Sequence, residues 1–231
     1  MPNNNSKSCC IIGAAPIPRF PQLPDHTAVF AADGGLDTLN AHSISPDAVI
    51  GDFDSLSDTE KLSALREKGC EIITLPVEKD DTDTAFAAKL ALSRGYKKLY
   101  ILGGLGGVRP DHSLANLQTL VMISKHSALG FLTDGLYAFT AIHGHSRLSF
   151  PPTVRGDISV FSAEGEAHGV TLRGMKYKLE NATLTGDFPI GVSNSFTGEA
   201  ATAELTSGSL WICFSCSELP LDDFPTAESL D

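Results

Sequence analysis

Residues 98–124 read KLYILGGLGGVRPDHSLANLQTLVMIS and contain three patterns in a row. The first five residues are a short apolar run typical of a buried strand, and the glycines that follow end that run. From His112 onward, leucines recur at helical spacing, which predicts an amphipathic helix. A strand, a glycine-rich turn and a helix in this order form the repeating unit of a parallel sheet with crossover helices.

The same alternation extends through about the first 140 residues. Apolar runs predict buried strands at 9–13, 28–32, 48–50, 71–75, 98–102 and 128–133. Amphipathic stretches between them predict helices at 36–42, 59–68, 82–93 and 112–124. We therefore expect an α/β domain over residues 1–145, with a Rossmann-like, mostly parallel sheet flanked by helices on both faces.

The helical period disappears after Pro151-Pro152. Short β-branched segments predict strands at 157–162, 170–172, 179–184, 191–196, 200–205 and 209–214. The sequence Thr206-Ser207-Gly208 predicts a hairpin turn between the last two. We expect a small antiparallel β-sandwich domain over 146–217, which leans on the first domain or on a partner subunit because its own core is small. Residues 218–231 are expected to be an acidic, frayed tail.

The composition and net charge limit the classes of partner that the chain is expected to bind. The chain has 231 residues, a formal net charge of −11 and 42% hydrophobic residues, which is ordinary globular composition. The negative charge argues against general binding of nucleic acids or anionic membranes. No apolar stretch is long enough to span a bilayer, and the polar N-terminus does not resemble a signal peptide, so we expect a cytoplasmic protein.

The chain contains five cysteines, of which Cys213 and Cys216 form a C-x-x-C pair. No second pair or nearby histidine lies at the spacing of a zinc site. We interpret the pair as reduced cysteines at a buried strand.

Aspartates follow the predicted strands. Asp33 comes after 28–32, Asp52 and Asp54 after 48–50, and Asp80, Asp81 and Asp83 after 71–75. The carboxyl ends of parallel strands share one edge of the sheet, so these acids should converge there and need a cation, for which Mg²⁺ suits hard oxygen ligands. The alternatives are structural, because Asp80, Asp81 or Asp83 could cap the helix near Thr82 and Asp33 could shape a turn. Asp52 and Asp54 favour the metal, because two residues apart they point the same way.

A glycine cluster forms the second chemical signal. Four glycines at 103–107 precede Arg109, Asp111 and His112, directly before the predicted helix. Glycines let a backbone approach phosphate closely, and the guanidinium group of Arg109 offers planar donors to phosphate oxygens. The spacing does not match a Walker loop. His112 alone fits the start of a helix equally well.

These residues, taken in order, resemble the thiamine pyrophosphokinase (thiamine diphosphokinase) family. The motifs that carry the resemblance are Ala32-Asp33-Gly34-Gly35, Pro46-Asp47 with Gly51-Asp52-Phe53-Asp54-Ser55, Lys79-Asp80-Asp81-Thr82-Asp83, Arg109-Pro110-Asp111-His112 with Leu114-Ala115-Asn116, Gly174-Met175-Lys176-Tyr177, and Gly191-Val192-Ser193-Asn194-Ser195-Phe196. The resemblance covers nearly the whole chain. It implies a homodimer whose active site uses both subunits, and transfer of the pyrophosphoryl group of ATP to the hydroxyl of thiamine, which gives thiamine diphosphate and AMP.

The resemblance also implies roles for individual residues. Asp52, Asp54 and Asp83 would hold Mg²⁺, with Mn²⁺ left open, and Asp33, Gly34 and Asp80 would line the same pocket. Arg109, Asp111 and His112 would lie near the phosphates of ATP. Ser193, Asn194 and Phe196 would contact thiamine. The predicted catalytic residues are Asp52, Asp54, Asp80, Asp83, Arg109 and Asp111, and either Asp80 or Asp111 could accept the hydroxyl proton.

One departure from the family motifs and two alternative functions stay open at this point. Val108 separates Arg109 from the glycines, whereas in many relatives the arginine follows them directly, so contacts by single loop glycines are left unassigned. A pyrophosphokinase of another hydroxymethyl compound, such as a pterin, would use the same carboxylates. A non-catalytic regulator that binds thiamine or a nucleotide would have little reason to keep so many costly like charges.

Overall fold

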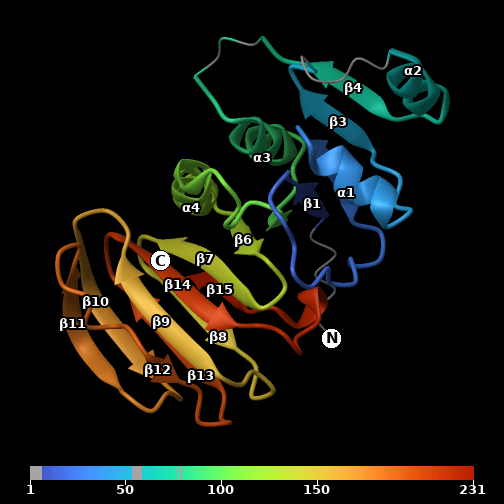
Figure 1. Cartoon of the computed structure of the whole chain (residues 1–231). Coiled ribbons are helices and arrows are strands. Elements are labelled where there is room, and N and C mark those ends of the chain that lie inside the picture. Colours follow the sequence, from blue (N-terminus) through green and yellow to red (C-terminus); the bar gives the residue numbers. More distant parts are fainter. Residues whose placement is uncertain (1–6, 54–58, 77, 79) are drawn as a thin grey trace.

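The computed structural model describes residues 7–53, 59–76, 78 and 80–231, and contains two β-sheets and associated helices (Figure 1). The strands are β1 (Ser8–Ile12), β2 (Ala28–Ala32), β3 (Ala48–Gly51), β4 (Glu71–Thr74), β5 (Lys98–Leu102), β6 (Leu129–Thr133), β7 (Tyr137–His143), β8 (Ser146–Phe150), β9 (Asp157–Ser162), β10 (Glu166–Arg173), β11 (Leu179–Thr185), β12 (Asn194–Ser195), β13 (Ala201–Leu205), β14 (Ser209–Ser215) and β15 (Thr226–Ser229). The helices are α1 (Gly35–Ala41), α2 (Thr59–Glu67), α3 (Asp83–Ser93), α4 (Pro110–Lys125) and the short 3-10 helix η1 (Leu221–Asp223).

The first half is the predicted parallel sheet. Strands β6, β5, β1, β2, β3 and β4 lie side by side in this order and are all parallel. The chain moves outward from β1 to β4 and then returns to the other side of β1, so β1 and β5 flank a topological switch point. Ligands of open α/β sheets bind outside the carboxyl ends of the strands at such a point.

Alternate residues of the buried strands face different layers. Leu99 and Ile101 of β5 belong to a cluster with residues of α3 and α4. Tyr100 and Leu102, on the other face, belong to the cluster that contains Leu36 and Leu39 of α1. The expectation of helices on both faces of the sheet is confirmed at this end.

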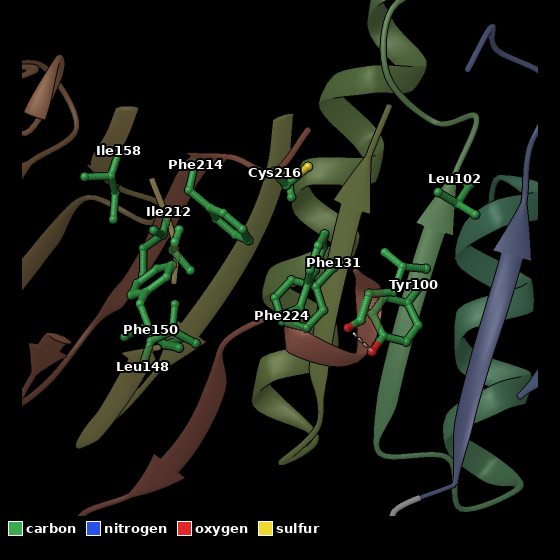
Figure 2. Packing of buried hydrophobic residues seen from close by; sticks show 14 of the residues in the cluster. Tyr100, Leu102, Phe131, Leu148, Phe150, Ile158, Ile212, Phe214, Cys216 and Phe224 are labelled. Atoms are coloured by element: carbon green, nitrogen blue, oxygen red, sulfur yellow. Dashed lines mark hydrogen bonds between the residues drawn. The ribbon is translucent and has the colours of Figure 1, made fainter. Parts of the chain in front are cut away.

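The second half continues the same sheet. Strand β7 pairs antiparallel with β6, and β14, β9 and β12 follow, so the large sheet has ten strands in the order β12-β9-β14-β7-β6-β5-β1-β2-β3-β4. A five-stranded sheet, β11-β10-β13-β8-β15, packs on this extension as the second layer of a sandwich. Phe150 from one layer meets Phe214 from the other with ring centroids 5.4 Å apart (Figure 2). The predicted sandwich is therefore present, and one of its layers is continuous with the α/β sheet.

The predicted hairpin at 206–208 is wrong. Strand β13 pairs with β10 and β8 in the small sheet, whereas β14 pairs with β7 and β9 in the large one. The turn therefore passes between layers, and it is held by the backbone of His168, which donates to Ser207 O and accepts from Thr206 N. Turn-forming residues predict a change of direction but not which sheet receives the next strand.

The expectation of a frayed C-terminal tail is also wrong. Leu221 and Phe224 are buried, and the hydroxyl of Tyr100 donates to the carbonyl of Leu221 at 2.8 Å (Figure 2). The ring of Phe224 lies 5.1 Å from that of Phe131. Strand β15 then pairs with β8. Residues 218–231 thus pack against β5 and β6, and the division into 1–145, 146–217 and 218–231 stays a prediction.

The C-x-x-C cysteines lie in and directly after β14, as the sequence predicts. Cys216 is buried, Cys213 is partly buried in β14, and both are free thiols. Burial raises the pKa of each thiol to about 11, which keeps it protonated near neutral pH. Among the described residues, no helix is both long and apolar enough to cross a membrane.

Candidate functional site

The first group of predicted site residues follows β2 and β3 at the carboxyl edge of the parallel sheet. Asp33 directly follows β2 with a positive φ of 50°, and its backbone N–H donates to Ile50 O at 2.9 Å. Gly34 occupies the N-cap position of α1. Asp52 directly follows β3 and is partly buried. The fold therefore brings Asp33, Gly34 and Asp52 to neighbouring strand ends.

The start of α3 settles which residue caps that helix. The side chain of Thr82 accepts a hydrogen bond from Ala85 N at 3.1 Å, so the cap is Thr82 and none of the three aspartates. Asp81 instead pairs with Lys89 at 2.6 Å. Asp83 is the first residue of the helix, where a negative charge is favoured by the helix dipole, and Asp80 is exposed just before it.

The donor set suits a hard cation as far as it is described. Asp52 and Asp83 offer carboxylate oxygens of the kind that Mg²⁺ prefers. Asp54, the third predicted ligand, lies outside the described residues. Within the described part of the chain, no group of three His, Cys, Asp or Glu side chains is placed to hold a metal.

The glycine-rich loop lies at the switch point. Gly13, after β1, donates its N–H to Leu102 O at 2.7 Å, and Ala15 donates to Gly103 O at 2.9 Å. A Cβ atom on Gly103 would lie 2.4 Å from Gly13 O, so only glycine permits this approach of the two strand ends. Asn116 of α4, a buried residue, donates from Nδ2 to Gly104 O at 2.9 Å. The loop is thus fixed from both sides.

Arg109 and Asp111 form a two-point ion pair where the loop enters α4. Nε of Arg109 donates to Oδ1 of Asp111 at 3.0 Å, and Nη2 donates to Oδ2 at 2.6 Å. Hydrogen bonding to Arg109 lowers the pKa of Asp111 to about 2. Both side chains are more than half exposed, so the guanidinium group can be reached by a ligand from the solvent. His112 follows in the first turn of α4 and is also exposed.

The predicted thiamine residues lie at the other end of the ten-stranded sheet. Ser193 is exposed, has a positive φ of 61°, and donates its N–H to Ser159 Oγ at 3.2 Å. Asn194 pairs with Ile158, near the start of β9, which places it on the same edge as the carboxyl ends of the parallel strands. The strands that carry Asp52 and Asn194 are the ninth and the first of the sheet.

Asn194 and Phe196 contact the protein itself. Oδ1 of Asn194 accepts from the N–H groups of Tyr177 and Ser195, each at 2.9 Å, and Nδ2 donates to Tyr177 O at 2.6 Å. This buried amide therefore holds the loop that presents the exposed ring of Tyr177. Phe196 packs against Phe150 with ring centroids 5.0 Å apart.

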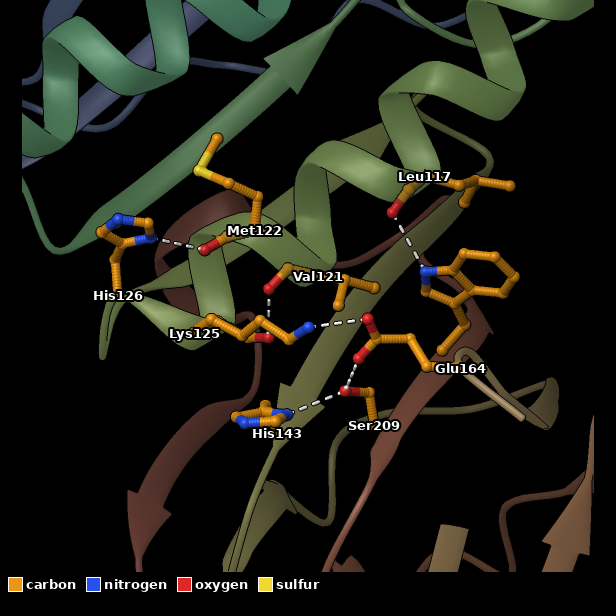
Figure 3. Close-up of polar contacts among 10 residues, drawn as sticks. Leu117, Val121, Met122, Lys125, His126, His143, Glu164 and Ser209 are labelled. Atoms are coloured by element: carbon orange, nitrogen blue, oxygen red, sulfur yellow. Dashed lines mark hydrogen bonds and ion pairs between the residues drawn. The ribbon is translucent and has the colours of Figure 1, made fainter. Parts of the chain in front are cut away.

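A second cluster of titratable groups lies at the opposite, amino-terminal edge (Figure 3). Ser209 Oγ donates to Glu164 Oε2 at 2.7 Å and lies 2.9 Å from His143 Nδ1, while Lys125 Nζ contacts Glu164 Oε1 at 2.6 Å. In a Ser-His-acid triad the histidine stands between the serine and the acid, whereas here the serine stands between them. The hydroxyl proton is directed to Glu164, so this arrangement joins α4 to the sandwich and does not activate a nucleophile.

Comparison with known proteins covers both halves of the chain. The model "Thiamin pyrophosphokinase, catalytic domain" matches residues 21–130, and "Thiamin pyrophosphokinase, vitamin B1 binding domain" matches residues 147–210. A curated thiamine pyrophosphokinase of Bacillus subtilis (strain 168) is 28% identical over 218 residues, which cover 88% of this chain and 96% of the relative. The chain belongs to the thiamine pyrophosphokinase family.

Solved structures of the family have the same fold. The crystal structure of thiamine pyrophosphokinase from Bacillus subtilis aligns with a TM-score of 0.80 and 26% identity, over 92% of this chain and all of the other. Yeast thiamin pyrophosphokinase aligns with a TM-score of 0.75 over 96% of this chain and 90% of the other. At 17% identity, the yeast structure supports the fold alone.

Two residues of α4 contact the glycine loop although no role was predicted for them from the sequence. Asn116 was part of the quoted Arg109 motif without a role, and Ser113 was not singled out. Ser113 Oγ accepts from Gly106 N at 2.9 Å, so both residues bind the glycine loop. Their positions one and two turns into α4 were the available signal, because residues three or four apart share a helix face. The functional roles of the predicted site residues stay predictions.

Proposed function

We infer that this chain transfers the pyrophosphoryl group of ATP to the hydroxyl of thiamine, giving thiamine diphosphate and AMP. The observation that supports this inference is that Asp33, Asp52 and the glycine loop with Arg109 all follow strands at the carboxyl edge of the parallel sheet, in a chain matched in both halves by the family. Phosphoryl-type transfer needs mainly positioning and neutralisation of charge, which these groups supply.

We propose Mg²⁺ as the cation, with Mn²⁺ the other candidate. Asp52, Asp54 and Asp83 would hold it by carboxylate oxygens. When bound, the ion would neutralise charge on the phosphate oxygens of ATP. Asp33, Gly34 and Asp80 would line the same pocket.

The phosphates of ATP are proposed to lie against the glycine loop and Arg109. A guanidinium group can bind two phosphate oxygens at once, and it would exchange its contacts with Asp111 for contacts with the ligand. His112 lies in the same exposed first turn of α4 and would contribute a ring nitrogen. Val108, between the glycines and Arg109, is almost fully exposed at 96%.

Thiamine is proposed to bind between two subunits of a homodimer. It is a cation, which suits an acidic edge, and the contacts of Ser193 and of the aromatic Phe196 would come from the partner copy. The supporting observation is the distance between the two groups, because Asp52 follows the ninth strand of the large sheet and Asn194 lies on the first. At about 4.8 Å per strand this is on the order of 40 Å, too far for both to contact one small substrate.

The test is a product assay on the purified chain with ATP, Mg²⁺ and thiamine. We expect thiamine diphosphate and AMP in equal amounts. A pterin alcohol should give neither pyrophosphorylated product nor AMP, and activity with that substrate alone would overturn the proposal. Binding of thiamine without turnover would indicate a regulator instead.

A cytoplasmic location also remains a proposal, which imaging of the tagged chain in its host would test.

A further inference from the structure

The backbone of the glycine loop is oriented by three carbonyl contacts. The carbonyls of Leu102 and Gly103 accept from backbone N–H groups after β1, at 2.7 and 2.9 Å. The carbonyl of Gly104 accepts from a side chain, Nδ2 of Asn116, at 2.9 Å. In a trans peptide the C=O of one residue and the N–H of the next point in opposite directions. The N–H groups of Gly103, Gly104 and Leu105 are therefore turned away from the groups that hold these carbonyls.

The N–H groups of Gly104 and Leu105 have no hydrogen-bond acceptor among the residues that the structure describes, whereas the N–H of Gly103 faces β6, where Leu102 pairs with Thr133 in the parallel ladder. Gly104 is itself buried. Buried backbone donors are rarely left without an acceptor in folded proteins. Successive donors of this kind at a strand end, beside Arg109, fit the oxygens of a phosphate group.

The peptide between Gly104 and Leu105 is held differently from its neighbours. Its carbonyl is bound by one side chain rather than by the backbone of β1, and glycine on its N-terminal side makes reversal of this peptide easy. Reversal would direct a carbonyl oxygen, in place of an N–H group, toward the anion. Asn116 is 4% exposed, and a Cβ on Gly104 would lie 2.8 Å from its Nδ2, so this contact is closely packed.

We propose that Asn116 is a positioning residue, which orients the Gly104–Leu105 peptide so that the N–H of Leu105 binds a phosphate oxygen of ATP. This inference rests on the proposed placement of the ATP phosphates at the loop. Asn116 itself does not contact the substrate.

Two substitutions separate orientation from packing. Asn116→Ala removes the donor and should lower kcat/KM for ATP about tenfold, with KM for thiamine within about twofold of wild type. Asn116→Asp keeps the size but offers an acceptor at neutral pH, which holds the peptide in the reversed orientation. It should lower kcat/KM for ATP further, to about one hundredth of wild type.

The pH dependence of Asn116→Asp supplies a further readout. A buried carboxyl group against a carbonyl oxygen has a raised pKa, and once protonated it can donate to Gly104 O as the amide does. The ratio of variant to wild-type kcat/KM for ATP should therefore rise at least threefold as the pH falls from 8 to 6. A role in packing alone predicts a constant ratio.

The matched control is Thr119→Val. Thr119 is equally buried in α4, and its hydroxyl donates only within the helix, to Ala115 O at 3.0 Å. Its kinetics should match those of wild type. If both Asn116 variants keep the wild-type kcat/KM for ATP while Arg109→Ala lowers it, the positioning role is wrong. If Arg109→Ala also has no effect, the placement of the phosphates is wrong, although formation of thiamine diphosphate by the wild type would still support the proposed function.

A measurement on the wild-type chain covers the case in which the variants do not fold. Amide hydrogen exchange over residues 103–108 should slow when inorganic diphosphate and Mg²⁺ are added, because the free N–H groups become bonded. Unchanged exchange at saturating diphosphate would contradict the proposal.

Discussion

Asp80 and Asp111 are the two candidates for the group that accepts the hydroxyl proton of thiamine, and their surroundings differ. Two N–H groups of Arg109 bind Asp111, and its lowered pKa of about 2 makes it a weak base near neutral pH. Asp80 is exposed and has no basic partner among the described residues. In the free protein Asp111 is thus the weaker base, and we propose Asp80 as the group that accepts the proton.

We expect Asp80→Asn to lower kcat at least 100-fold, because general-base catalysis contributes about 10²–10⁴ in rate. Asp111→Asn should mainly raise KM for ATP, by freeing and misorienting Arg109. Steady-state kinetics with each substrate varied in turn will separate the two effects. Asp81→Asn is the neighbouring control, since its exposed ion pair with Lys89 contributes little. A kcat within threefold of wild type for Asp80→Asn would exclude Asp80 as the base.

At the scale of elements, α4 is joined to the sandwich by Lys125, Glu164 and Ser209. The hydrogen bonds from Lys125 and Ser209 lower the pKa of Glu164 from its ordinary 4.5. Because the folded-state pKa lies below the unfolded one, the stabilisation is complete above about pH 4.5 and is lost as the pH falls below it. The buried hydroxyl of Ser209 depends on this carboxylate as its acceptor.

Glu164→Gln should therefore lower the free energy of unfolding by about 1 kcal/mol at pH 7. The difference from wild type should shrink toward zero as the pH falls below 4.5, because protonation removes the same charge from wild type. Urea unfolding at a series of pH values measures both. Glu166→Gln, an exposed acid two residues away, should show neither effect. A difference that stays constant down to pH 3 would contradict the assigned role of the charge.

The C-terminal segment is the second element-scale case. Phe224 fills the space between Phe131, Phe214 and Tyr100, so Phe224→Ala should cost about 3–5 kcal/mol in the free energy of unfolding. Asp222→Ala, exposed in the same 3-10 helix, should cost less than about 0.5 kcal/mol. Chemical denaturation measures the free energy of unfolding of both variants. If Phe224→Ala lowers it as little as Asp222→Ala does, this segment does not stabilise the fold.

The same elements show what could be predicted from sequence. The strands and helices of the first half were predicted nearly to the residue, because continuous apolar runs and helical spacing are local signals. Strands β7 and β8 were not predicted. The segment around Leu221 and Phe224 was predicted to be exposed because it is rich in acidic residues, although both of these side chains are buried. The aspartates and Arg109 were identified by residue type and position. The contacts of Asn116 with Gly104 and of Asn194 with Tyr177 could not be, because tertiary packing creates them.

At the scale of the whole molecule, the question is how two distant groups of residues serve one reaction. Tyr177, which Asn194 binds, has an exposed side chain, and so do three apolar residues shortly before Ser193 in the sequence, namely Phe188, Ile190 and Val192. Such side chains gathered in one region are typical of an interface between proteins. We propose that these residues contact a second copy, which would bring Ser193 to the partner's carboxylate edge.

Mixed dimers test this arrangement directly. Asp83→Asn impairs the carboxylate edge and Ser193→Phe blocks the proposed thiamine contact, so each variant alone should have little activity. If each site combines the two groups from different chains, co-expression of the variants gives hybrid dimers with one site free of both substitutions, and random pairing leaves about a quarter of all sites intact. Activity near a quarter of wild type in the mixture, and near a half in dimers purified through a tag on each variant, would support a shared site. If both groups of each site came from one chain, every chain would carry one substitution, and the mixture would remain as inactive as its components.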